Sequence, residues 1–139
     1  MGRRPSPNAP CPCGSGAKTK RCCGRYHRGA PAPTPEALMR SRYAAYALGD
    51  AAYIQRTTHP GGPHWEPDAA AWARSILVFC RSTDFEALEV RAASEDGERG
   101  EVTFRAQLVQ GGRDASFVER SRFLRVEGRW LYHSGERVA

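Results

Sequence analysis

The sequence predicts an α+β fold, in which helices from the first half pack inside a curved antiparallel sheet from the second half. Apolar residues recur at helical spacing up to residue 79, and after Cys80 the apolar period changes to two, as in half-buried strands. Glycine-containing turns separate the strand segments. The chain has 139 residues and a mean hydropathy of −0.60. This length suffices for one domain with its own core and a small appendage, and it excludes two large domains.

The first two predicted helices have clear start and stop signals. Thr34 is a good N-cap, and Pro35 and Glu36 suit the first helical turn. Gly49 ends this helix, and Asp50 caps a second, short helix through Ala52, Tyr53 and Ile54. The apolar stripe of the first helix consists of Leu38, Met39, Tyr43, Tyr46 and Ala47.

The rest of the body is predicted as one further helix followed by an antiparallel meander. Residues 59–63, rich in proline and glycine, form a loop, and a helix runs from Pro67 to Phe79. The predicted strands are residues 85–93, 101–110, 116–126 and 129–133. The turns between them contain Asp96-Gly97, Gly111-Gly112 and Glu127-Gly128.

Charge is distributed unevenly along the chain. Residues 1–33 carry seven lysines or arginines and no acid, whereas the remainder has a net charge of −1. We therefore expect a disordered basic N-terminus over residues 1–10, a proline-rich connector over residues 29–35, and a folded domain over residues 36–139. The sequence contains neither an apolar run of membrane-spanning length nor a secretory signal pattern. It is therefore predicted to be cytoplasmic, without a membrane partner.

Four of the five cysteines lie together in the basic segment, with the spacing C-x-C, eight residues, C-C. Four thiolates can surround zinc tetrahedrally and leave no position for water, so the zinc ion would be structural. Residues 14–16, Gly-Ser-Gly, permit the required chain reversal. A disulfide framework is the alternative, but the missing secretory signal disfavours it. His27, four residues beyond Cys23, is an alternative to Cys23 as the last ligand.

The pattern C-P-C-G-S-G-x-K-x-K-x-C-C-G resembles the SEC-C zinc motif at the C-terminus of the preprotein translocase ATPase. This resemblance implies a zinc-binding segment over residues 11–28, with Cys11, Cys13, Cys22 and Cys23 as ligands. The translocase motif contacts a secretion chaperone and the ribosome, which implies an acidic protein surface or ribosomal RNA as partner. Candidate partner-binding residues are Lys18, Lys20, Arg21 and Arg25.

The order of helices and strands is similar to that of the cone-shaped, nuclear-transport-factor-2-like (NTF2-like), SnoaL-like superfamily. More narrowly, the sequence resembles the YchJ family of uncharacterised bacterial proteins. The residues that carry this resemblance are 38–43 (LMRSRY), 58–60 (THP), 119–123 (ERSRF) and 128–132 (GRWLY). Superfamily members often enclose a pocket used for isomerisation, dehydration, cyclisation or binding. Some dimerise through the open sheet face, so a homodimer is an expectation here.

The candidate pocket residues are His59, Glu119, Ser121 and Trp130. On a strand, Glu119 and Ser121 share one face, so they would be polar groups in an aromatic hollow, where a carboxylate can act as a general base. The competing and more common outcome is a structural ion pair between Glu119 and an arginine, for which the candidates are Arg40, Arg42, Arg120 and Arg122. His59 could equally be a loop histidine bonded to the backbone.

Two functions follow from these observations. The first is a zinc-binding adaptor with a basic lobe attached to a cone domain. The alternative is a small-molecule-binding protein, or an isomerase-like or dehydratase-like enzyme, that uses the cone pocket. The sequence contains no phosphate-binding loop, zincin motif or nucleophile elbow, so we assign no catalytic residue and favour a protein that is not an enzyme. An enclosed hollow of roughly a few hundred Å³ with Glu119 unpaired would favour the alternative, whereas a collapsed interior with Glu119 bonded to an arginine would exclude it.

Overall fold

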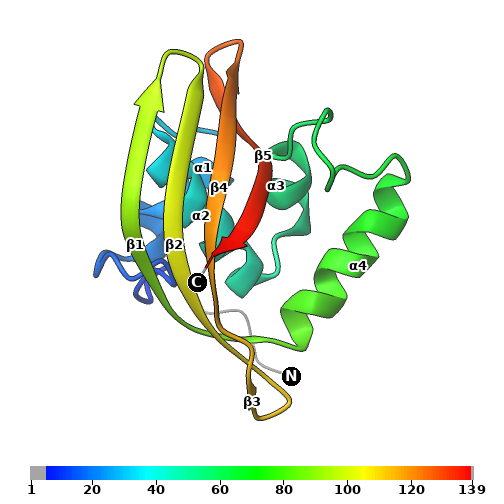
Figure 1. Cartoon of the computed structure of the whole chain (residues 1–139). Helices are drawn as coiled ribbons and strands as arrows, with labels where there is room; N and C mark the ends of the chain where they lie inside the picture. Colours follow the sequence, from blue (N-terminus) through cyan, green and yellow to red (C-terminus); the bar gives the residue numbers. More distant parts are fainter. Residues whose placement is uncertain (1–5, 139) are drawn as a thin grey trace.

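The computed structural model describes residues 6–138 and contains an antiparallel sheet with helices packed against one face (Figure 1). The strands follow the order β1-β2-β4-β5, and the short β3 pairs with β2. The predicted α+β fold is therefore confirmed. The strand bounds are β1 Asp84–Asp96, β2 Arg99–Gln110, β3 Arg113–Asp114, β4 Phe117–Val126 and β5 Arg129–Val138.

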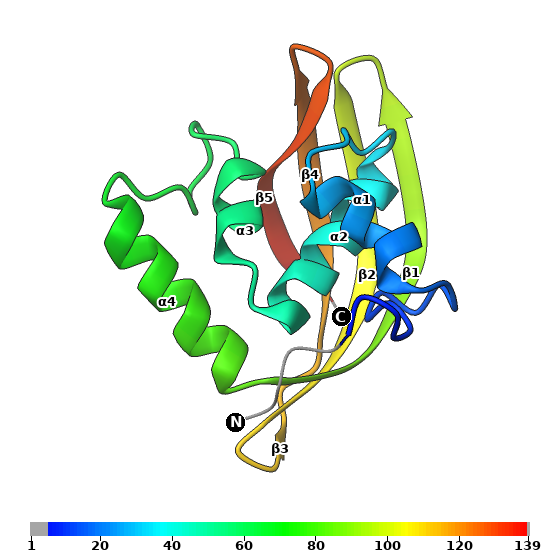
Figure 2. The same cartoon turned by 180° about the vertical axis from the view of Figure 1, so that it is seen from behind.

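Helix α2 packs against the concave face of the sheet, and α3 and α4 pack against α2 (Figure 2). Thr34 Oγ1 accepts a hydrogen bond from the Ala37 amide at 3.0 Å, which fixes the start of α2. Gly49 ends α2 with a φ of +74°, a conformation that favours glycine. Among residues 6–138, no helix combines the length and the apolar character needed to cross a bilayer. The helix bounds are α2 Pro35–Leu48, α3 Ala51–Arg56 and α4 Ala69–Arg81.

Several elements differ in extent from their predictions. Strand β1 ends at Asp96 and β2 begins at Arg99, so the hairpin that they form is longer than predicted. Helix α4 begins at Ala69, two residues later than predicted, because Asp68 is its N-cap and accepts a hydrogen bond from the Ala71 amide at 3.0 Å. Strand β5 continues past the predicted end at His133 as far as Val138, because residues 134–138 pair with β4 across a register shift. That extension lengthens the wall of the sheet on the side where β4 and β5 meet.

The cysteine-rich segment forms a small lobe, residues 6–28, beside α2. It contains the 3-10 helix η1 Thr19–Arg21 and the short helix α1 Cys23–His27, neither of which the sequence predicts. Disorder was predicted for residues 1–10. Residues 1–5 lie outside the described part of the chain, and residues 6–10 run beside the cysteine hairpin. The Thr19 amide donates to the Ala9 carbonyl at 3.0 Å and the Lys20 amide to the Pro7 carbonyl at 3.1 Å, so the hairpin supplies this segment with backbone partners.

The segment predicted as a connector packs onto the domain. Ala32 is buried, and Pro35 is the first residue of α2, so the connector ends at Thr34, one residue earlier than predicted. Pro35 lies directly over Gly100 of β2, where any Cβ would overlap with the proline ring, so this close approach requires glycine. The core that α2 and α3 form with the sheet includes Leu38, Ile54, Val102, Phe104, Phe123 and Trp130.

Candidate metal centre and internal cavity

The sulfur atoms of Cys11, Cys13, Cys22 and Cys23 all lie within 4.8 Å of one another. The Sγ atoms of Cys13 and Cys22 are 3.6 Å apart, and those of Cys22 and Cys23 are 3.9 Å apart. A tetrahedral zinc ion with zinc–sulfur bonds of ~2.3 Å requires sulfur–sulfur separations of roughly 3.8 Å. Cys22 is partly exposed and the other three cysteines are buried. These four side chains could hold one metal ion.

Backbone geometry brings the two cysteine pairs together. The Cys11 amide donates to the Ala17 carbonyl at 2.9 Å, which closes the hairpin between the pairs. Gly14 and Gly16 have φ values of +84° and +86°, so the chain reversal depends on the left-handed conformations that glycine adopts readily. At the tip, Ser15 Oγ lies 3.1 Å from Cys22 Sγ and can donate a hydrogen bond to a thiolate there.

His27, the alternative fourth ligand, does not join the cysteines. Its Nε2 lies 2.8 Å from the Ser41 carbonyl oxygen of α2, and its ring meets Tyr53 edge-on, with 4.7 Å between ring centroids. Burial lowers the pKa of His27, which favours the neutral ring. Arg56 of α3 donates to the His27 carbonyl at 2.6 Å. His27 therefore anchors the lobe on the two helices.

A second anchor joins the cysteine hairpin itself to α2. Arg40 Nη1 donates to the Cys13 carbonyl oxygen at 3.1 Å, while its Nε is paired with Glu36 at 2.9 Å. The buried cysteines also pack against Ala44 of α2 and Leu88 of β1. Because of these contacts, loss of the metal-binding geometry would expose apolar surface of the main domain.

The predicted partner-binding residues form an exposed basic surface on the lobe. Lys18, Lys20, Arg21 and Arg25 are all exposed. No ion pair in the described part of the chain involves any of them, and residues 6–33 contain no acid. Arg25 stacks over the Tyr26 ring at 5.1 Å from its centroid, and its Nε donates to the Cys22 carbonyl at 3.0 Å. This surface can attract anionic groups without first breaking an internal salt bridge.

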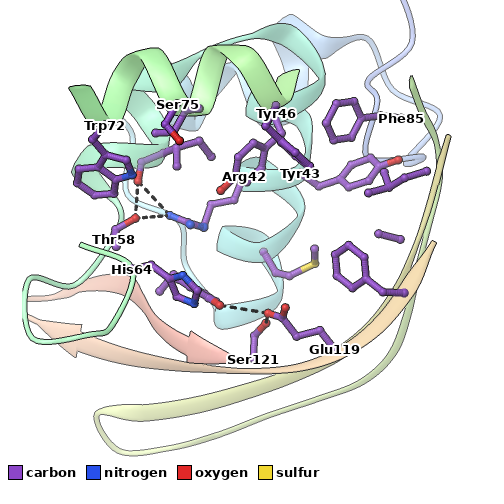
Figure 3. A pocket seen from close by; sticks show the side chains of 18 of the residues that line it. Arg42, Tyr43, Tyr46, Thr58, His64, Trp72, Ser75, Phe85, Glu119 and Ser121 are labelled. Atoms are coloured by element: carbon purple, nitrogen blue, oxygen red, sulfur yellow. Dashed lines mark hydrogen bonds between the residues drawn. The ribbon is translucent and has the colours of Figure 1, made fainter. Parts of the chain in front are cut away.

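A cavity of about 760 Å³ lies between α2, α4 and the sheet (Figure 3). Glu119 and Ser121 line it, as the alternation along β4 predicts. Tyr43 and Tyr46 of α2, expected in the core, also border it, and burial raises the pKa of Tyr43 to about 12. The other aromatic residues of the lining are Trp72, Phe79, Phe85, Phe104, Phe117, Phe123 and Tyr132.

The other two predicted pocket residues lie elsewhere. Trp130 is 3% exposed and does not border the cavity, because it packs at the end of the sheet where the start of α2 closes over Gly100. His59 does not border the cavity: its Nδ1 accepts a hydrogen bond from the Gly61 amide at 2.8 Å, and its ring lies beside His133. For His59, the backbone-bonded alternative was therefore right. The histidine that lines the cavity is His64, farther along the same loop.

Glu119 does not pair with any of the four arginines that were expected, and its ion-pair partner is instead Arg137 of β5. Its Oε2 accepts hydrogen bonds from Ser121 Oγ at 2.6 Å and Tyr132 Oη at 3.2 Å. Burial, and then the charge of Glu119, raise the pKa of Tyr132, so its phenol remains a donor. The nearest cation is the exposed Arg137, whose Nε lies 3.9 Å from Oε1.

The four arginines proposed for that pair have other partners. Arg120 and Arg122 alternate with Glu119 along β4, point to the outer face of the sheet, and pair with Glu136 at 2.7 and 3.1 Å. Arg40 pairs with Glu36. Because neighbouring residues of a strand point to opposite faces, Arg120 and Arg122 cannot reach Glu119 although they are close to it in sequence.

Arg42 is the cavity residue whose role sequence reasoning missed. Only 7% of it is exposed, and it borders the cavity from α2. Its Nη1 donates to the Ile54 carbonyl, Thr57 Oγ1 and Thr58 Oγ1 at 3.1, 2.8 and 3.2 Å. A signal was available, because Arg42 lies one helical turn after Leu38 and one before Tyr46, on the face that the apolar stripe predicts to be buried.

Comparisons with known proteins match both parts of the chain. The family model for the YchJ middle NTF2-like domain matches residues 34–135, and that for the SEC-C motif matches residues 8–25. A UPF0225 protein from Streptomyces coelicolor is 44% identical over 131 residues, covering 94% of this chain and 97% of its own length. A UPF0225 protein from Deinococcus radiodurans is 43% identical, covering 91% and 88%, respectively.

Two solved structures share this arrangement. A SEC-C motif-containing protein from Rhodopseudomonas palustris, solved in solution, aligns with a TM-score of 0.78 at 41% identity, covering 94% of this chain and all of that one. A SEC-C motif-containing protein from Psychrobacter arcticus aligns with a TM-score of 0.75 at 24% identity, covering 93% and 82%. The chain therefore belongs to the YchJ (UPF0225) family, with a SEC-C motif preceding an NTF2-like domain.

Proposed function

We propose that this protein binds a small organic molecule in the cavity between α2, α4 and the sheet, and that a structural zinc ion holds its N-terminal lobe in place. The observation that carries the first part is a cavity of about 760 Å³, lined by aromatic rings, in which Glu119 is held by two hydroxyl groups and meets one arginine, the exposed Arg137, at 3.9 Å. Cavities of this size, mostly apolar with a few polar groups, are typical of small-molecule sites.

Filling the cavity should abolish binding of an apolar probe. Ser75 of α4 is exposed and borders the cavity, so Ser75→Trp would place an indole in it with little disturbance of the core. We expect the fluorescence of N-phenyl-1-naphthylamine to rise on addition of the wild-type protein and to stay at its level in water with Ser75→Trp. Arg74→Trp, at the neighbouring exposed position outside the cavity, should bind the probe as the wild type does. Equal binding by both variants would refute the cavity site.

The zinc proposal depends on the number, kind and spacing of the ligands. Four thiolates favour zinc over magnesium or calcium, which prefer oxygen ligands, and they complete a tetrahedron without water. Cobalt(II) added anaerobically to the metal-free protein should therefore give the intense visible bands of tetrahedral cobalt–thiolate coordination, and zinc should then bleach them. A weak spectrum typical of octahedral oxygen coordination would contradict the proposed ligand set.

A second candidate function, an adaptor that binds an acidic protein surface through the lobe, is favoured by the four exposed cations, which form no ion pair within the described residues. Replacing Lys18, Lys20, Arg21 and Arg25 with glutamine should abolish binding to fluorescent poly-L-glutamate at low salt, measured by anisotropy. The control has the same charge change elsewhere, with glutamine at Arg74, Arg81, Arg99 and Arg113, and should retain most of the binding. If the lobe variant and the control variant lose binding equally, the binding depends on the net charge of the protein and not on the surface of the lobe. Preference for poly-uridylate would indicate RNA instead.

A further inference from the structure

From Arg42 we infer that the cavity ligand is an organic acid with one carboxylate, which pairs with the Arg42 guanidinium while an apolar or aromatic body fills the space beside it. This inference rests on the proposed small-molecule site and names the class of its ligand. Arg42 and Glu119 both project into the cavity, from α2 and β4, respectively (Figure 3).

The first step concerns the charge of Arg42. An arginine side chain stays protonated in proteins, and a buried charge without a counter-charge is costly. Within residues 6–138, no carboxylate oxygen lies within 4 Å of this guanidinium. Its partners are one carbonyl, two threonine hydroxyls and the Tyr132 ring, whose centroid is 4.6 Å from Cζ. A ligand carboxylate would supply the missing negative charge.

The second step concerns the donors that remain. The three hydrogen bonds that Arg42 makes to α3 and the residues following it all start at Nη1. The Tyr46 hydroxyl lies near the guanidinium: burial raises the pKa of Tyr46, and Arg42 opposes that rise. The fully buried polar side-chain atom without a partner in the described residues is Trp130 Nε1, so Nε and Nη2 of Arg42 each either have a partner or keep some exposure. These two nitrogens form a planar edge that matches a carboxylate.

The third step favours a single carboxylate over a doubly charged phosphate. Glu119 places a negative charge on the same cavity, held by Ser121 and Tyr132. Tyr132 stands between the two charges, since its ring stacks on Arg42 and its hydroxyl binds Glu119. The lining carries two arginines, Arg42 and Arg137, and three carboxylates, Glu66, Asp68 and Glu119, so a monoanion meets less repulsion there than a doubly charged phosphate would, and the aromatic lining suits an apolar body.

The test compares two ligands of nearly identical shape, 2-naphthoate and 2-naphthamide, by isothermal titration calorimetry at pH 7. We expect the acid to bind the wild-type protein ~10-fold to ~100-fold more tightly than the amide, as a charged hydrogen-bonded pair provides. Arg42→Met should abolish this preference. Glu119→Gln, which removes the opposing charge, should tighten binding of the acid several-fold more than binding of the amide.

The outcomes separate the two proposals. Equal affinity of the acid and the amide in the wild-type protein would overturn the carboxylate assignment while leaving the cavity site intact. Failure of both naphthalenes in a protein that still binds N-phenyl-1-naphthylamine would also overturn it. Failure of all three molecules would refute the proposed site itself. Because the wild-type comparison and Glu119→Gln carry the test, it does not depend on Arg42→Met folding.

Discussion

Cys11→Ser should abolish zinc binding and unfold the lobe of residues 6–28 in the full-length protein. A serine hydroxyl is a poor zinc ligand, and the lobe contains two short helices whose packing centres on the sulfur cluster. Structural zinc contributes ~10–16 kcal/mol to the folding of small metal-binding segments, far more than the lobe could recover elsewhere. Elemental analysis of protein purified without oxygen should give one zinc per wild-type chain and essentially none for the variant.

The main domain should lose stability as well. Unfolding of the lobe breaks the Arg40, His27 and Arg56 hydrogen bonds that join it to α2 and α3, each worth about 1 kcal/mol. We therefore expect the free energy of unfolding of the domain to fall by about 2–3 kcal/mol in chemical denaturation. In Cys11→Ser, the backbone amides of residues 6–28 should exchange rapidly with solvent, whereas those of β2 and β4 should exchange slowly.

Cys80→Ser is the matched control. Cys80 lies on α4, away from the sulfur cluster, and burial raises its pKa to about 11, so it behaves as a small apolar side chain. This variant should retain full zinc content and an ordered lobe. If Cys11→Ser retains zinc at the wild-type level, or loses zinc while the lobe stays protected from exchange, the structural-zinc proposal is wrong.

Local signals in the sequence predicted the helices and most strands well, for identifiable reasons. Thr34, Asp50 and Asp68 cap helices through bonds to residues three positions ahead, so each signal and its partner lie within one turn of chain. The turns before β2, β3 and β5 contain glycines with positive φ, a requirement that is likewise local. The four cysteines were predicted as a cluster because their spacing encodes a hairpin.

Features that depend on long-range packing were predicted less well. Trp130 shares a face with Tyr132, but only the tertiary structure shows that Pro35 closes its end of the sheet. The arginines near Glu119 in sequence pair elsewhere, while the closest cation, Arg137, comes from the neighbouring strand β5. For Arg42, its position on the apolar face indicated burial, but its partners lie 12 to 16 residues away.

The loop that carries His64 into the cavity is tied to β5, and Gly62→Ala should break that tie. The His59 amide donates to the Tyr132 carbonyl at 2.7 Å, and the Tyr132 amide donates to the Thr57 carbonyl at 2.8 Å. A Cβ on Gly62 would overlap with the His133 carbonyl oxygen and lie 3.1 Å from its carbon. Because both atoms belong to the backbone, no side-chain rotation relieves the overlap, and the loop must retreat from β5.

We expect Gly62→Ala to lower the free energy of unfolding by about 1–3 kcal/mol, the usual cost of overpacking. It should also weaken binding of N-phenyl-1-naphthylamine, because Pro63 and His64 border the cavity.

Gly61→Ala is the matched control: its added methyl group meets only the His59 ring, at 3.1 Å, which can rotate away. Neither glycine has a positive φ, so both backbones accept alanine. Gly61→Ala should change stability by less than about 0.5 kcal/mol. Equal losses in the two variants, measured by thermal and chemical unfolding, would show that this contact does not hold the loop, and the coupling between β5 and the cavity mouth would then have to be abandoned.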